Sequence, residues 1–146
     1  MTELLVVIAI IAITIGVSIP TLWTYYRSAA LRGAAEDTVT YLNNARQLAI
    51  RLNTTVCVTI DATGMQYHTG TCGAAAYTGP GTTSTGYMTL GTGLSVSGAT
   101  NLCFNYLGAG ATTPAPCTNA GTITITRAQG GTTSVVMATT GRVRIQ

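Results

Sequence analysis

The feature that most constrains this chain is an apolar run near its start, residues 4–19, which contains no charged side chain and directly follows Glu3. A helix needs about 20 apolar residues to span a membrane, with about 17 as the lower limit, so the run lies near that threshold. A cleaved signal would begin with basic residues, whereas the only charge here is acidic and helix-forming sequence continues past Tyr26. We therefore expect a retained helix that needs lipid or other helices around it.

The helical pattern continues to residue 52 but changes character on the way. Gly16 and Pro20 interrupt the apolar half, and Pro20 is expected to kink the helix or release one backbone hydrogen bond. In the second half, apolar residues recur at helical spacing along one stripe, which comprises Leu31, Ala35, Leu42, Ala45, Ala49 and Leu52. We predict a stem of residues 1–26, placed in a membrane or a filament core, and a head of residues 27–146. The head combines an amphipathic half-helix, 27–52, with a β-rich domain, 53–146.

The rest of the chain has the alternation and turn residues of short β-strands. Charged residues make up only 8% of the sequence, while Gly and Thr are abundant after residue 60. Strands are predicted close to residues 54–61, 65–70, 87–90, 94–96, 102–106, 122–128, 132–139 and 141–146. The expected fold class is α+β, with a long N-terminal helix packed on an antiparallel β-sheet.

The four cysteines favour disulfides over a metal site. They are Cys57, Cys72, Cys103 and Cys117, none of them in a C-x-x-C pair, and the chain has a single histidine. Three pairings are open. The favoured one, Cys57–Cys72 with Cys103–Cys117, closes two loops of about 15 residues, each worth about 3 kcal/mol in the chain-entropy model.

Catalytic constellations and cofactor motifs are not found in the sequence, so we expect no enzyme and no cofactor. Glu36 and Asp37 are adjacent and point to different faces of the predicted helix. Asp61 lies at a turn, where Asp commonly bonds its own backbone. His68 has no nucleophile near it in the sequence, and we interpret it as a surface histidine.

The stem ELLVVIAIIAITIGVSIP resembles that of type IV pilins and type II secretion pseudopilins, in which a glutamate precedes an apolar run and a proline follows seventeen residues after the glutamate. Glu3 and Pro20 keep that spacing. The segment ARQLAIRLNTTVCVTID and the ending TGRVRIQ are similar to the GspH/FimT subgroup. In that family the glutamate is the fifth residue of the processed chain, whereas here it is the third, so the resemblance does not assign N-methylation to Met1.

The resemblance implies a structural role. Burying a carboxylate among aliphatic helices costs free energy unless an opposite charge pairs with it. The family resemblance implies that Glu3 pairs with the N-terminal amine of a neighbouring subunit. Glu3, Gly16 and Pro20 are therefore the expected assembly residues. Implied partners are further copies of the chain in a helical filament, the bacterial inner membrane before assembly, the pilus or secretion machinery, and prepilin peptidase.

The ending GRVR offers a second, competing role. Arg142 and Arg144 lie two apart on a predicted strand, so both side chains project from one face, where two guanidinium groups can grip phosphates. In FimT-like minor pilins such an element is associated with DNA capture, which the resemblance would carry to Gly141, Arg142 and Arg144. Two contacts supply little affinity, so DNA is not favoured. We expect a main subunit of an extracellular filament; the alternatives are a FimT-like DNA-binding minor pilin and a GspH-like minor pseudopilin.

Overall fold

A computed structural model describes residues 2–79 and 82–146 of the chain, with the side chains of residues 17, 18, 20, 21 and 24 outside the described set. Helix α1, Thr2–Leu52, runs without a break through residue 20, in agreement with the predicted extent of the helix. The predicted kink depends on Pro20, whose side chain lies outside the described residues. The chain divides into two compact units, Met1–Ala30 and Leu31–Gln146.

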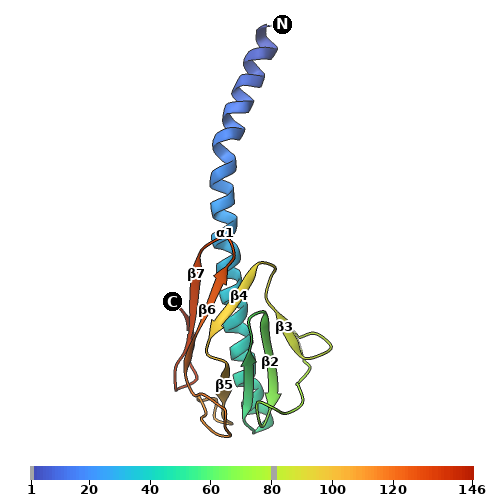
Figure 1. The fold of residues 1–146 in the computed structure, drawn as a ribbon, viewed down its shortest axis with the longest axis vertical. Helices are drawn as coiled ribbons and strands as arrows, with labels where there is room; N and C mark the ends of the chain where they lie inside the picture. The colour runs from blue at the N-terminus through green and yellow to red at the C-terminus, as the bar shows by residue number, and fades with distance from the viewer. Residues whose placement is uncertain (1, 80–81) are drawn as a thin grey trace. The chain divides into compact units, whose positions relative to one another are not determined.

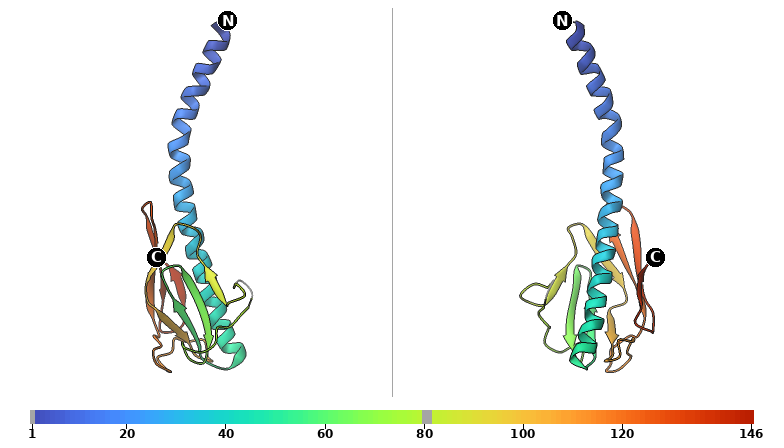
Figure 2. Two further views of the ribbon diagram at one scale, coloured as in Figure 1. Left: turned by 45° about the vertical axis from the view of Figure 1, so that its right-hand side comes forward. Right: turned by 180° about the vertical axis from the view of Figure 1, so that it is seen from behind.

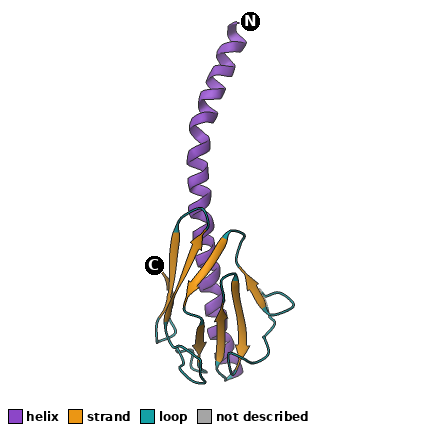
Figure 3. Cartoon of the chain, in the orientation of Figure 1, coloured by secondary structure: helices purple, strands orange, loops and turns teal. Residues whose placement is uncertain are grey.

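The larger unit is an α+β head with two antiparallel sheets, which confirms the predicted fold class (Figure 1). One sheet has the order β3-β2-β1-β5 and the other the order β4-β6-β7-β8. The strands are β1 Val56–Ile60, β2 Gly64–Thr69, β3 Tyr87–Thr89, β4 Leu94–Gly98, β5 Asn101–Phe104, β6 Gly121–Arg127, β7 Thr132–Met137 and β8 Val143–Ile145. All eight overlap the predicted segments, but the division into two sheets was not predicted. Figure 3 shows the loops that join the strands.

The second half of α1 covers one face of the sheets, as the view from behind in Figure 2 shows. Its buried residues recur every three or four positions: Leu31, Ala34, Ala35, Thr38, Tyr41, Leu42, Ala45, Leu48 and Ala49. Four of them are alanines, whose small side chains let the helix approach the strands closely. Leu52, predicted on the same stripe, is 43% exposed because the helix ends there and leaves the sheet.

The end of the helix is set by Asn53, the one non-glycine residue with a positive φ (50°) among those described. Asparagine tolerates this left-handed conformation better than most residues. The turn brings the amide of Thr54 to the carbonyl of Ala49 at 3.2 Å, which satisfies a carbonyl that the helix itself leaves free. The chain then enters β1 directly.

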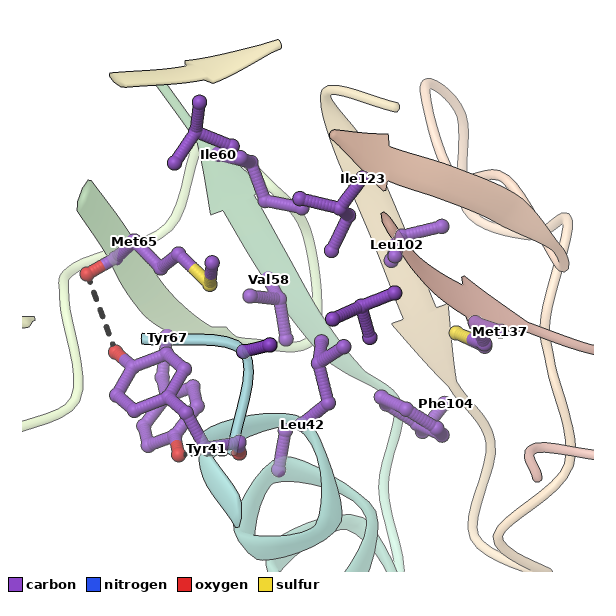
Figure 4. Close-up of a cluster of buried hydrophobic side chains, with 14 of the residues drawn as sticks. Tyr41, Leu42, Val58, Ile60, Met65, Tyr67, Leu102, Phe104, Ile123 and Met137 are labelled. Atoms are coloured by element: carbon purple, nitrogen blue, oxygen red, sulfur yellow. Dashed lines mark hydrogen bonds between the residues drawn. The ribbon is translucent and has the colours of Figure 1, made fainter. Parts of the chain in front are cut away.

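The core lies between the helix and the two sheets (Figure 4). Leu42 of the helix, Val58 of β1, Phe104 of β5 and Ile123 of β6 are all fully buried. Both sheets therefore contribute to one continuous apolar cluster with the helix. Burial of side chains of this size stabilises the fold by about 1.5–3 kcal/mol each.

Two tyrosines anchor the helix to β2 by polar contacts inside this core. The rings of Tyr41 and Tyr67 stack with their centroids 3.9 Å apart. The hydroxyl of Tyr67 donates to the carbonyl of Tyr41 at 2.6 Å, and the hydroxyl of Tyr41 donates to the carbonyl of Met65 at 3.2 Å. Burial raises the pKa of both hydroxyls above the ordinary tyrosine value, so both remain protonated donors.

Candidate functional site

The stem presents apolar side chains on all sides. In the unit that ends at Ala30, the large apolar side chains of residues 4–26 that are described are between 48% and 71% exposed. Gly16 has open space around it: apart from the backbone of the helix itself, no heavy atom lies within 4 Å of the point that a Cβ would occupy. A helix that is apolar on every face needs a partner surface along its whole length.

Glu3 lies in the first turn of α1, next to this apolar surface. Its side chain is exposed, and an acid at this position interacts favourably with the positive end of the helix dipole. The described residues hold one ion pair, between Arg32 and Glu36 at 3.1 Å, and Glu3 takes no part in it. The assembly role of Glu3 therefore stays a prediction, as do those of Gly16 and Pro20.

Residues 1–26 were expected to insert in a membrane, but no helix among the described residues is long and apolar enough to cross one.

The disulfides have the pairing that the sequence favoured. Cys57 bonds Cys72 across 15 residues, and Cys103 bonds Cys117 across 14. Cys57 and Cys103 are direct partners on the neighbouring strands β1 and β5, so the two disulfides lie side by side and all four sulfurs are within 4.8 Å of one another. Each disulfide ties a long loop to the first sheet. No cysteine in the chain is free, so the oxidised chain offers no thiolate to a metal.

His68 is a buried structural residue, and the prediction of a surface histidine was wrong. It is 8% exposed and lies in β2 opposite Cys57. Its Nδ1 donates to the carbonyl of Ala74 at 2.7 Å, and its Nε2 lies 3.0 Å from the hydroxyl of Thr59. His68 lies on the face of the sheet opposite the helix, and it is buried because the loop after β2 folds back over the strand, which sequence alternation does not reveal. The ring thus holds that loop beside the Cys57–Cys72 disulfide.

Asp61 organises the β1–β2 turn, as the sequence predicted. Its Oδ1 accepts hydrogen bonds from the amides of Thr63 at 2.8 Å and Gly64 at 3.0 Å, and from the hydroxyl of Tyr87. Although partial burial opposes ionisation, the hydrogen bonds from Tyr87, Thr63 and Gly64 hold the pKa of Asp61 below its usual value of 3.8. This carboxylate is a turn residue that ties β3 to the hairpin.

The C-terminal arginines lie on the outside of the second sheet. Arg142 and Arg144 are exposed, while Val143 between them is partly buried, so the predicted alternation is correct. Gly141 is buried, with φ +77°, and a Cβ there would overlap the carbonyl oxygen of Gly108. The absence of a side chain at Gly141 is thus required by packing between two turns. Binding of DNA by these residues stays a prediction.

The architecture described above, a long helix with an apolar first part packed through its second part on antiparallel sheets, defines a pilin-like subunit. The sequence model of the family described as Type II transport protein GspH matches residues 34–141, most of the head. This chain belongs to the GspH family. The family is structural and non-enzymatic, and it is consistent with a location at the inner membrane and in the periplasm or an extracellular pilus.

Solved structures share the fold. The minor pseudopilin EpsH from the type 2 secretion system of Vibrio cholerae is 17% identical, with a TM-score of 0.59 over 80% of this chain and 95% of that one. The type IV minor pilin FimU of Pseudomonas aeruginosa is also 17% identical, with a TM-score of 0.57 over 84% of this chain and 92% of that one. No curated protein sequence matches the chain significantly. At these identities the likeness establishes a common fold.

Proposed function

We propose that this chain is a GspH-like minor subunit of a pilin-type filament, with a type II secretion pseudopilus as the favoured assembly. The observation that carries the proposal is the match of the GspH family to residues 34–141. A main filament subunit was the role expected from the sequence. The family match and the neighbours EpsH and FimU, each of which is described as a minor subunit, support the minor-subunit alternative better.

The stem supplies the means of assembly. Its apolar side chains, up to 71% exposed at Leu5, lose their contact with water or lipid only when other stems pack around them. Glu3 then becomes a buried acid, which is tolerated when a cation pairs with it. The N-terminal amine of an adjacent subunit is the partner that we assign to this carboxylate. Before assembly, the subunit is located at the inner membrane.

Matched charge variants test the assembly role. Glu3→Gln removes the carboxylate at the start of the apolar run, whereas Glu36→Gln removes an exposed carboxylate whose ion pair with Arg32 is worth at most about 1 kcal/mol. Filaments sheared from the producing cells are analysed by quantitative mass spectrometry, beside the membrane fraction. We expect the wild-type chain and Glu36→Gln at a few copies per filament, and Glu3→Gln only in membranes.

Two results would contradict the proposal. If the wild-type chain forms the bulk of long filaments, it is a main subunit. If Glu3→Gln and Glu36→Gln are incorporated equally, the carboxylate of Glu3 has no role in assembly. Deletion of the chain separates the two systems, because loss of protein secretion with intact pili assigns it to a secretion system and the reverse result assigns it to a pilus.

A further inference from the structure

A cavity of about 270 Å³, lined by both polar and apolar side chains, lies in the head beside the last turns of α1. Asn44, Gln47, Leu48 and Arg51 line one wall, and Tyr67 with Tyr77 lines the other. The four helix residues are spaced at three, four and seven positions from Asn44, which places them on one face of the helix.

The charge in the cavity is uncompensated. Arg51 is exposed, and its Nη2 donates to the neutral hydroxyl of Tyr77 at 3.3 Å. The chain has four acidic residues, and none of them lines the cavity. Two of these are engaged elsewhere in the head, Glu36 with Arg32 and Asp61 in the β1–β2 turn. A guanidinium has five N–H donors in a fork that suits a carboxylate.

The neighbouring side chains of Asn44 and Gln47 add hydrogen-bond donors and carry no negative charge. No hydrogen bond joins the side-chain amides of Asn44 or Gln47 to another residue in the described part of the chain. Each amide has two N–H donors, so the wall facing the cavity carries donors on three successive turns of the helix. Leu48 is buried and forms an apolar floor.

Tyr67, on the opposite wall, is held in place by its neighbours. Tyr67 is 3% exposed, its ring is stacked on Tyr41, and its hydroxyl already donates to the carbonyl of Tyr41. The cavity is therefore formed in the isolated chain and does not depend on a ligand to open it. Preformed sites lose little free energy to ordering when they bind.

We propose that this cavity receives the carboxylate side chain of an acidic residue on an adjacent pilin-type subunit. Small-molecule pockets usually measure about 300–1,000 Å³, so a cavity below that range suits one inserted side chain. Arg51 pairs with the carboxylate, while Asn44 and Gln47 donate to its remaining lone pairs. This inference rests on the proposed function, because it names a contact made within the filament.

The binding chemistry is tested on the full chain in detergent micelles, labelled with ¹⁵N. The probes are the capped peptides acetyl-Gly-Glu-Gly-amide and acetyl-Gly-Gln-Gly-amide, which differ only in the carboxylate. Arg51→Gln removes the guanidinium, and Arg127→Gln, on β6, removes the same charge outside the cavity. We expect the glutamate peptide to shift the side-chain amide signals of Asn44 and Gln47 saturably. The glutamine peptide and Arg51→Gln should each bind roughly tenfold more weakly or worse, while Arg127→Gln binds as wild type.

Equal shifts from both peptides, or equal losses in the two variants, would overturn the carboxylate site. The partner is tested by incorporation into sheared filaments, which Arg51→Gln should lower and Arg127→Gln should not. If the glutamate peptide binds but Arg51→Gln incorporates normally, an adjacent subunit is not the occupant. Failure of the proposed minor-subunit function can be told apart from failure of the carboxylate site. In the first case the wild-type chain itself would be missing from filaments or would form most of them, irrespective of the result for Arg51→Gln.

Discussion

The substitution Gly141→Ala separates a packing role from a binding role at the C-terminal GRVR element. Gly141 has φ +77°, and a left-handed conformation costs an alanine about 1–2 kcal/mol. The new Cβ would also overlap the carbonyl oxygen of Gly108, and overpacking of this kind costs about 1–3 kcal/mol more. We expect a total loss of about 2–5 kcal/mol in the free energy of unfolding.

Gly130→Ala is the matched control. Gly130 has φ +92° in the turn between β6 and β7, but nothing lies within 4 Å of a Cβ placed there. This variant should lose only the conformational part, about 1–2 kcal/mol. Urea unfolding of the disulfide-intact chain in detergent, followed by the near-ultraviolet circular dichroism of the buried tyrosines, measures both losses. Equal unfolding midpoints for Gly141→Ala and Gly130→Ala would refute the argument that contact with Gly108 requires a glycine.

Three further predictions concern the stability of the head, and each is measured by urea unfolding. Replacing Cys57 and Cys72 together by serine should cost about 3 kcal/mol, since the lost loop spans 15 residues, and an unchanged midpoint would contradict a stabilising disulfide. Leu42→Ala should cost about 2–5 kcal/mol because Leu42 is fully buried between the helix and the sheets; a loss below about 1 kcal/mol would mean that this interface is loosely packed. The folded pKa of Asp61 lies below 3.8, so its stabilisation is present above about pH 4 and is lost as the pH falls through the folded pKa. Asp61→Asn should remove this pH-dependent part, which is under about 1 kcal/mol at so exposed a carboxylate, and an identical acid dependence in both chains would contradict the assignment.

Local patterns account for most of the elements. The helix was predictable to residue 52 because apolar spacing of three and four residues persists through Leu31, Leu42 and Ala49. The eight strands were predictable because alternation and turn residues act over a few positions only. The pairing of Cys57 with Cys72 was also favoured by sequence proximity, which lowers the entropy of closing a loop.

The sequence by itself determined the kind of chain this is: an apolar helix with Glu3 at its start, an amphipathic continuation, and a β-rich, disulfide-bonded head. Only the tertiary structure decided how the strands divide into two sheets, that a returning loop buries His68, and that Gly141 packs on Gly108. It also brought Arg51 of the helix opposite Tyr77 of a distant loop. The physical reason is that periodicity reports which face of an element is apolar, whereas contacts between residues far apart in sequence depend on how the elements pack.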